Sequence, residues 1–291
     1  MRSLSIIGCG NVGKTLGRLW SQEKVFSIGD ILNRSEESGS AAVRFIGAGR
    51  AVVGIAEMSP AEVFLISTPD EYIVESCSAL AASGLLRTGD LVFHCSGALP
   101  SIDLISAKGA GACIGSVHPV KSFANPAVSA ETFSGTFCGM EGDDQALGIL
   151  RPAFEAVGGK IFAINPQFKT IYHAAAVMTC NYLTSLVEIG AQAYLKAGLD
   201  RETSMQVMEP IVRGTVENIF NSGTVGALTG PIARGDHSTV SKQLAALSDW
   251  NPRLGNLYRD LGATALELSR LQGTAPPDSL AALAKLLEQR D

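Results

Sequence analysis

The sequence predicts an α/β protein in which a doubly wound parallel sheet comes first and an all-helical domain follows. Between Leu4 and about Ile164, short apolar runs typical of buried strands alternate with amphipathic stretches typical of helices. This alternation builds a parallel sheet with helices on both faces. Beyond Pro166 the strand patterns disappear and long helical patterns take over. We therefore divide the chain into domains of residues 1–165 and 166–291.

Each element of the first domain follows from its own pattern. The strands are short runs of apolar and β-branched residues, and the helices show apolar residues three and four positions apart. Strands are expected at Leu4–Ile7, Phe26–Leu32, Val63–Ser67, Leu91–His94, Ala112–Ser116, Thr136–Met140 and Lys160–Ile164, and helices at Val12–Gln22, Asp70–Ser83 and Asp143–Val157.

The second domain shows only helical periodicity. Its apolar residues recur at helical spacing, and one clear loop interrupts them late in the chain, at 272–277. Helices are expected at Lys169–Ala197, Arg201–Asn221, Thr239–Leu247, Pro252–Leu271 and Ser279–Gln289.

A glycine motif of the form G-x-G-x-x-G, made of Gly8, Gly10 and Gly13, follows the first predicted strand. The motif alone is weak in a chain with 31 glycines, but a strand before it and a helix after it are the context that a Rossmann-type dinucleotide site requires. There the first glycine permits a tight turn, the second lets the backbone approach a pyrophosphate, and the third lets helix and strand pack closely. We expect this turn, with Asn11 and Val12 at the helix N-terminus, to bind the cofactor. A glycine-rich turn without a ligand is the alternative.

The end of the second strand indicates which nucleotide is bound. NAD-binding units place an acidic residue about 20 residues beyond the glycines, where it accepts hydrogen bonds from the ribose. Here the chain reads Asn33-Arg34-Ser35 instead, and an arginine beside a hydroxyl and an amide suits a 2′-phosphate. The sequence therefore favours NADP, held by these three residues. The alternatives are a solvated Arg34 and, if the strand register differs by three residues, Asp30 as the ribose acceptor. S-adenosylmethionine sites usually have an acidic residue at this position as well, so its absence counts against S-adenosylmethionine as the ligand.

Three further loops follow predicted strands, and ligands in such sheets bind outside the carboxyl ends of the strands. Thr68 and Pro69 are expected to border the nicotinamide ribose, although the same loop also suits a helix cap. Ser96 is expected to contact the cofactor, because small residues follow this strand. His94 and His118 stand at strand ends, where a functional and a structural histidine are both open; His118 is our candidate for binding substrate.

Composition excludes several classes of protein. Hydrophobic residues make up 46% of the chain and charged residues 18%, which is typical of a well-packed globular protein. The net charge of −5 gives no reason to expect nucleic acid as a partner. The six cysteines form no C-x-x-C pair, which favours a reducing compartment over a disulfide framework or a metal site. No stretch predicts a membrane span, and we expect a cytoplasmic protein without a metal.

Five motifs together resemble a known family. They are Asn-Arg-Ser at 33–35, Thr-Pro-Asp at 68–70, His-Cys-Ser-Gly at 94–97, Gly-Ser-Val-His-Pro at 115–119 and Thr-Gly-Pro-Ile-Ala-Arg-Gly-Asp at 229–236. The pattern is similar to Rossmann-like NADP-binding proteins with a C-terminal helical domain of unknown function. These are relatives of pyrroline-5-carboxylate reductase, deazaflavin-dependent NADP reductase and ketopantoate reductase. The resemblance spans nearly the whole chain and says little about the substrate.

The long helix after the boundary can be compared with that of ketopantoate reductase, which carries a general-acid lysine, an asparagine four residues on and a second asparagine eight residues on. The matching positions here are His173, Val177 and Asn181, so the resemblance implies His173 as proton donor and Asn181 as its companion on one helical face. An imidazole suits proton transfer because its pKa lies near working pH. Lys169, one turn earlier, is the rival donor, and a core histidine is the structural alternative.

A loop before the helix predicted at Thr239 carries Arg234 and Asp236. A guanidinium on such a loop suits a substrate carboxylate, so both residues are candidates for substrate binding. An ion pair between them, or a helix cap formed by Asp236 or Ser238, explains the same residues more simply.

The resulting hypothesis is an NADP-dependent oxidoreductase that moves a hydride between the nicotinamide and a small carbonyl or imine compound in the interdomain cleft. The relatives pair their helical halves, so we expect a homodimer. Two other functions stay open. A non-catalytic NADP sensor is favoured by the lost lysine and asparagine, and a transferase would use the same turn for another nucleotide.

Overall fold

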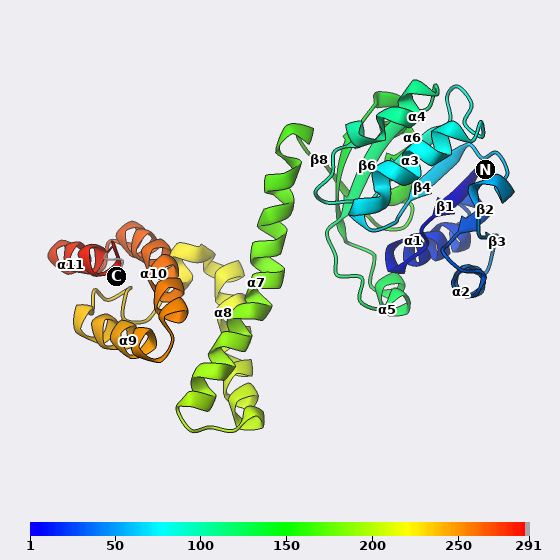
Figure 1. The fold of residues 1–291 in the computed structure, drawn as a ribbon. Helices are drawn as coiled ribbons and strands as arrows, with labels where there is room; N and C mark the ends of the chain where they lie inside the picture. Colours follow the sequence, from blue (N-terminus) through cyan, green and yellow to red (C-terminus); the bar gives the residue numbers. More distant parts are fainter. Residues whose placement is uncertain (289–291) are drawn as a thin grey trace. The chain divides into compact units, whose positions relative to one another are not determined.

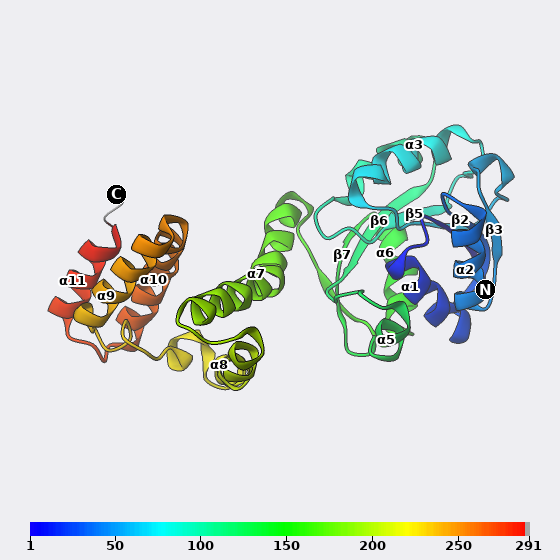
Figure 2. The ribbon, with the colours of Figure 1, turned by 60° about the horizontal axis from the view of Figure 1, so that its bottom comes forward.

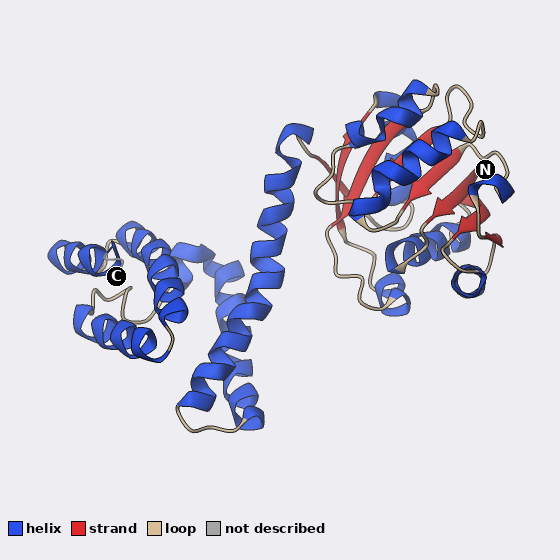
Figure 3. Cartoon of the chain, viewed as in Figure 1, coloured by secondary structure: helices blue, strands red, loops and turns tan. Residues whose placement is uncertain are grey.

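The computed structural model describes residues 1–288, and the chain divides into two compact units, unit 1 at Met1–Leu183 and unit 2 at Thr184–Asp291. Unit 1 contains an eight-stranded sheet flanked by helices, whereas the described part of unit 2 consists of helices joined by loops (Figures 1 and 3). The predicted fold class is therefore confirmed. The last strand ends at Ala163, close to the boundary expected from the sequence, but unit 1 continues to Leu183.

The sheet has the strand order β3-β2-β1-β4-β5-β6-β7-β8. From β1 the chain first adds β2 and β3 on one side and then adds β4 on the other side of β1. At this switch point the ends of β1 and β4 lie beside the glycine turn. The strands are β1 (Arg2–Ile7), β2 (Phe26–Leu32), β3 (Arg50–Val52), β4 (Val63–Ile66), β5 (Leu91–His94), β6 (Cys113–Pro119), β7 (Phe137–Gly142) and β8 (Lys160–Ala163).

One pair of strands corrects the expectation of a wholly parallel sheet. β6 and β7 are antiparallel, with Ser116 opposite Glu141 and His118 opposite Gly139, whereas every other pair is parallel. A parallel connection needs a crossover element that packs back over the sheet. Between β6 and β7 the chain forms only the six-residue helix α5 (Pro126–Glu131), which is too short for that crossover.

Helices cover both faces of the sheet, because alternate residues of each strand point to opposite faces. Leu4 and Leu65 belong to one core with α1 and α6, whereas Phe64 and Ile66 belong to a second core with α3. Figure 2 shows α3 on one side of the strands and α1, α2 and α6 on the other. The remaining elements of unit 1 are α1 (Asn11–Gln22), α2 (Glu36–Ile46), η1 (Ile55–Glu57), η2 (Asp70–Tyr72), α3 (Ile73–Ala82), η3 (Ser101–Leu104), α4 (Ile105–Gly109), α6 (Asp144–Glu155) and η4 (Pro166–Phe168).

Several of these elements were not predicted, and each has a local reason. α2 carries Gly39 and two serines in eleven residues, and a third serine caps it, a composition that favours loops over helices. β3 is only three residues long, and α4 and α5 span five and six residues. Elements of this length show no measurable periodicity, so they emerge from packing rather than from a sequence pattern.

Helices α7 to α11 follow the sheet, and the last three pack around a small core that contains Val240, Leu266 and Leu283. α8 is interrupted at Gly223, whose φ of 72° and ψ of 167° are not helical. No helix within residues 1–288 is long and apolar enough to cross a membrane. The prediction for Gln289 lies outside the described residues. The bounds are α7 (Lys169–Lys196), α8 (Arg201–Ala227), α9 (His237–Trp250), α10 (Pro252–Gln272) and α11 (Pro277–Glu288).

Candidate functional site

The candidate site lies at one edge of the sheet in unit 1, where a single row of residues crosses five strands. Ile7, Ile66, His94, Ser116 and Glu141 are register partners from β1 through β4, β5 and β6 to β7. The residues that follow the first three strands of this row therefore emerge side by side at the carboxyl edge. The glycine turn and the loops after β4 and β5 meet there.

The glycine turn has the geometry that a pyrophosphate site needs. Gly8 has a φ of +79°, and a Cβ added to it would lie 2.4 Å from the Thr68 side chain. A Cβ at Gly13 would lie 2.5 Å from Ser67 Oγ, so α1 can approach β4 only because this residue is glycine. At Gly10, in contrast, nothing lies within 4 Å of the added atom, which leaves the backbone accessible to a ligand.

The N-terminus of α1 is open to an anion. Gly10 is the N-cap residue, no side chain caps the helix, and its first turn contains no acidic residue. The N–H groups at the start of a helix have no partner within it, and the dipole favours negative charge there. The turn therefore fits the phosphates of a dinucleotide.

Asn11 and Asn33 have side-chain roles that the sequence analysis did not foresee. Asn11 Nδ2 donates a hydrogen bond to the Phe123 carbonyl at 2.7 Å, so this amide holds the loop between β6 and α5. Asn33 Oδ1 accepts from the Cys9 N–H at 2.6 Å, which ties the end of β2 to the glycine turn. Through these contacts both amides brace the site, and only the backbone of Asn11 remains available to a pyrophosphate.

The end of β2 leaves one cation free. Arg34 is exposed and forms no hydrogen bond or ion pair within residues 1–288, whereas Ser35 Oγ accepts from Ser38 N and caps α2. Asp30, the alternative ribose acceptor, is buried and bonded to Arg50 at 2.8 and 3.1 Å and to the Ser59 N–H at 2.6 Å. These bonds occupy both of its carboxylate oxygens.

A cavity of about 100 Å³ opens beside the turn, lined by residues that include Val12, Thr68, Asp70 and Ser96. Thr68 Oγ1 is buried there without a hydrogen-bond partner, and a buried hydroxyl of this kind calls for a ligand or water. Ser96 is already engaged, since its Oγ donates to Asp70 Oδ2 at 2.7 Å and accepts from two backbone N–H groups. Pro69 is exposed and precedes η2.

His94 is a structural histidine. It is fully buried, its Nδ1 accepts from the Ser96 N–H at 3.1 Å, and its Nε2 faces the Pro100 carbonyl at 3.3 Å. Burial, reinforced by the positive charge of Lys169, lowers the pKa of His94 to about 3. A neutral ring held at both nitrogens is not available for proton transfer, so the functional alternative for His94 does not apply.

Lys169, the rival proton donor, lies in a buried ion pair. Its side chain is 1% exposed, and Nζ donates to Glu141 Oε1 at 3.0 Å and to Ser116 Oγ. Glu141 in turn accepts from the N–H and the hydroxyl of Ser101 at 2.8 and 2.6 Å. Burial lowers the pKa of Lys169, and the Glu141 carboxylate opposes that shift. The pair fixes the first turn of α7 on the sheet.

His118 and His173 come together at the end of this edge. Their ring centroids are 5.6 Å apart, and His118 Nδ1 lies 2.9 Å from the Tyr172 hydroxyl. Burial, together with the nearby His173 and Lys169, lowers the pKa of His118 to about 4. The structure thus joins two predicted residues, one from β6 and one from α7. Asn181 lies two turns further along α7 and is exposed.

Tyr172 and Glu141 are site residues that the sequence analysis missed. A weak signal existed for Glu141, because it is the one charged residue in a strand of small and apolar residues, and such a carboxylate needs a buried partner. Tyr172 is adjacent in sequence to the predicted His173, and its hydroxyl also needs a hydrogen-bond partner when buried. Neither pattern identifies the partner, which is Lys169 of α7 for Glu141 and His118 of β6 for Tyr172.

In unit 2, the structure favours the simpler explanation for the loop at 229–236. Asp236 caps α9, with Oδ1 accepting from the Thr239 N–H at 3.0 Å and Oδ2 from the Thr239 hydroxyl at 2.7 Å. Arg234 is exposed. Substrate binding by these two residues stays a prediction.

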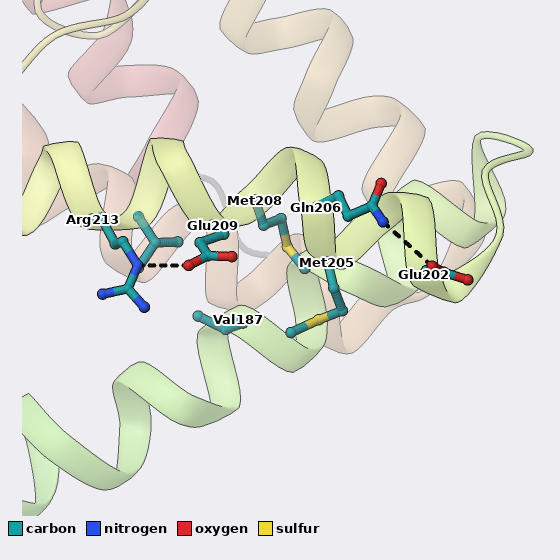
Figure 4. A pocket seen from close by; sticks show the side chains of 8 residues that line it. Val187, Glu202, Met205, Gln206, Met208, Glu209 and Arg213 are labelled. Carbon is teal, nitrogen blue, oxygen red and sulfur yellow. Dashed lines mark hydrogen bonds and ion pairs between the residues drawn. The ribbon is translucent and has the colours of Figure 1, made fainter.

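A second cavity, of about 600 Å³, lies between α7 and α8 in unit 2 (Figure 4). Val187, Met205 and Met208 give it an apolar wall. Its polar side chains pair with one another, Arg213 with Glu209 at 2.8 Å and Gln206 with Glu202 at 3.4 Å. It holds no residue that the sequence analysis predicted for catalysis.

Comparisons with known proteins match both halves of the chain. A Rossmann-like domain model matches residues 1–119, and the model of a domain of unknown function, DUF2520, matches residues 136–265. A search of curated proteins finds no match.

Solved structures share the fold. Protein TM1727 from Thermotoga maritima is 27% identical with a TM-score of 0.74, covering 93% of this chain and 99% of its own. A protein from Bacteroides fragilis, assigned as an NADP oxidoreductase, is 21% identical with a TM-score of 0.72, covering 91% and 97%. Pyrroline carboxylate reductase from Plasmodium falciparum, solved with NADP bound, is 16% identical with a TM-score of 0.56, covering 94% and 98%. The chain therefore combines a Rossmann-like domain with a DUF2520 domain.

Proposed function

We propose that this protein is an NADP-dependent oxidoreductase acting on a small carbonyl or imine compound. One observation carries the proposal: a glycine turn open to a dinucleotide and a pair of adjacent histidines lie at the same edge of one sheet. A nicotinamide bound there supplies or accepts the hydride. The chain itself then has to provide only binding, orientation and one proton.

The cofactor would be held mainly by backbone and small side chains. The N–H groups of Asn11 and Val12 are the donors for the pyrophosphate. The Gly10 N–H already donates to the Gly8 carbonyl at 2.8 Å, so Gly10 contributes by letting the backbone approach the phosphates. The unpartnered hydroxyl of Thr68, beside Pro69, is the donor that faces the cavity next to the turn. The similar structures assigned to or solved with NADP support this class of cofactor.

Arg34 supports NADP over NAD. It is the exposed cation after β2, and Asp30, the carboxylate of β2 itself, is held by Arg50 and Ser59 and is not free to bind a ribose. Asn33 and Ser35 would act indirectly, by fixing the turn and the start of α2. A guanidinium binds a phosphate through charge-assisted hydrogen bonds.

The first prediction concerns this cation. Arg34→Ala should weaken NADPH binding at least about tenfold, or about 1.4 kcal/mol, and leave NADH binding nearly unchanged. Titration of both nucleotides by calorimetry checks it. Arg44→Ala removes an exposed charge from the far end of α2 and should alter neither affinity. Equal loss of NADPH and NADH affinity in Arg34→Ala would refute a role at the 2′-phosphate.

His173 is proposed as the proton donor and Asn181 as its companion, with His118 beside the substrate. Lys169 is the weaker candidate because its ammonium is buried and bonded to Glu141 and Ser116. His173 makes no hydrogen bond within the described residues, and only its Nδ1 is buried, so Nε2 is free to reach a ligand.

The second prediction separates an enzyme from a sensor. His173→Asn should retain NADPH binding within about twofold and lower the rate of NADPH oxidation at least about a hundredfold, as expected for a lost general acid. A panel of small carbonyl and imine compounds is screened with the wild type first. His237→Asn changes an exposed histidine of α9 and should leave the rate unchanged. Undiminished turnover in His173→Asn would contradict its role, and NADPH binding without any turnover would favour a sensor.

A homodimer is proposed on the apolar surface of α7 and α8. Large apolar side chains such as Leu195, Ile211 and Phe220 are 41%, 57% and 85% exposed, and exposed patches of this kind usually mark interaction sites. Sedimentation equilibrium should give twice the chain mass, and Phe220→Glu should shift the protein toward a monomer. A wild-type monomer at micromolar concentration would contradict the proposal.

Six free thiols fit a reducing compartment such as the cytoplasm.

A further inference from the structure

Three side chains at the edge of the sheet form a line: Tyr172, His118 and His173. The Tyr172 hydroxyl lies 2.9 Å from His118 Nδ1, and the ring of His118 meets the ring of His173 nearly at right angles, with centroids 5.6 Å apart. The line connects the first turns of α7 to the end of β6. It ends at the histidine that we propose as proton donor, so the inference below rests on that proposed function.

The surroundings of each group determine which atoms of this line carry a proton. Burial raises the pKa of Tyr172 to about 12, so the phenol keeps its proton at neutral pH. The pKa of His118 is lowered to about 4 by burial and by the neighbouring His173 and Lys169, against a smaller opposing effect of Asp70. A neutral His118 that accepts the phenol proton at Nδ1 carries its own proton on Nε2.

Gly97 lies against both imidazole rings, at the point where they approach each other. A Cβ added to Gly97 would lie 2.3 Å from His173 Nδ1 and 2.9 Å from His118 Nε2, so both nitrogens border the same point. His173 Nδ1 is buried and has no hydrogen-bond partner. A buried acceptor without a partner is costly, and the Nε2–H of His118 borders the space that Nδ1 borders. One water molecule that bridges the two nitrogens would satisfy both.

We propose that Tyr172 and His118 are positioning residues that hold His173 in the tautomer with its proton on Nε2. The Tyr172 hydroxyl donates to His118 Nδ1, and His118 Nε2–H donates toward His173 Nδ1. His173 therefore presents an N–H at the one ring nitrogen that is not buried. Lys169 and Asp70 are the charged groups that act on His118, and neither forms a hydrogen bond to it.

The same line balances the proton transfer. When His173 gives its Nε2 proton to the alkoxide or amine nitrogen of the product, Nδ1 takes the Nε2 proton of His118 through the bridging water. His118 Nδ1 takes the phenol proton of Tyr172, which leaves a phenolate. After the product leaves, solvent water gives a proton to His173 Nε2, and the protons return along the line to restore the phenol and both resting tautomers. No imidazolate forms, and each N–H or O–H bond that breaks is matched by one that forms. Oxidation reverses these steps.

The experiment is ¹⁵N NMR of the histidine rings in the full-length protein without nucleotide. The chain has four histidines, and replacing each one with glutamine assigns its signals. The ring of His118 should stay neutral between pH 5 and 8, with a pyrrole-type Nε2 and a pyridine-type Nδ1, and the neutral form of His173 should show the same tautomer. In the wild-type spectrum, either a charged His118 at pH 6 or an Nδ1–H tautomer of either ring would be enough to overturn the proposal.

Tyr172→Phe adds a matched test of the line. Without the phenol proton, His118 should lose its single tautomer, and its two ring signals should move toward each other. Tyr182→Phe removes an exposed hydroxyl from the same helix that makes no hydrogen bond within residues 1–288, and it should change nothing. Unaltered histidine signals in Tyr172→Phe would refute the role of Tyr172. Because no nucleotide is present, failure here is distinct from failure of NADPH binding or turnover.

Discussion

Lys169→Met should lower the free energy of unfolding of unit 1 by about 3–5 kcal/mol, the usual cost of leaving one partner of a buried ion pair without the other. The variant leaves Glu141, whose side chain is 4% exposed, without its charged partner. Within residues 1–288, the donors that then remain bonded to it are the N–H and the hydroxyl of Ser101. Ser116 Oγ loses its donor as well.

The measurement is denaturant unfolding followed by tryptophan fluorescence. Trp20 is fully buried in unit 1 and packs edge-to-face on Phe26 and Phe154, so a Trp250→Phe background makes the signal specific for this unit. Adding Glu141→Gln to Lys169→Met should restore much of the loss, since a neutral amide still accepts from Ser101 without a buried charge.

Lys108→Met is the matched control for Lys169→Met. It breaks the Lys108–Asp143 pair, whose side chains are 46% and 30% exposed, and should cost no more than about 1 kcal/mol. If Lys169→Met cost as little as Lys108→Met, the buried pair would not be what fixes α7 to the sheet.

Gly8→Ala should weaken NADPH binding at least about a hundredfold, or about 2.8 kcal/mol. Alanine is strained at a φ of +79°, and its Cβ would lie 2.7 and 2.8 Å from Thr68 backbone atoms, so the turn or the loop after β4 has to move. Either movement displaces a proposed cofactor contact, at Gly10 or at Thr68. Calorimetric titration with NADPH measures the loss.

Gly47→Ala separates backbone strain from the loss of the site. Gly47 has a nearly equal φ of +82° at the end of α2, and nothing lies within 4 Å of an added Cβ. It should cost about 1 kcal/mol of stability and leave NADPH affinity unchanged. Comparable affinity losses in both variants would mean that Gly8 acts through general destabilisation.

The elements that were predicted well are those with a strong local pattern. β2 and β5 have the predicted bounds, and the long α7 differs by one residue at its end. The antiparallel pairing of β7 was missed, because direction depends on how the chain crosses from Pro119 to Phe137 and not on the strand's own residues. Alternation between strands and helices does not record that crossing.

The site was predicted in its position but not in its internal bonds. The glycine turn, Thr68 and His118 follow from the rule that ligands bind at the carboxyl ends of strands. The partners of Asn11 and Lys169 lie 112 and 28 residues away in the sequence, at Phe123 and Glu141. Lys169 and His173 share one helical face, so periodicity cannot separate them. What distinguishes the two residues is Glu141 on β7, which forms a buried ion pair with Lys169.

A crystal structure of the protein with NADPH would test the proposed function most sharply. We expect the pyrophosphate over the backbone of Gly10 and Val12, the 2′-phosphate against Arg34, and the nicotinamide ring between Thr68 and His173. A nucleotide bound in this way with His173 at its ring would place cofactor and proton donor in one site. NADPH absent from the glycine turn at saturating concentration, or bound with its nicotinamide pointing away from His173, would contradict the proposed oxidoreductase.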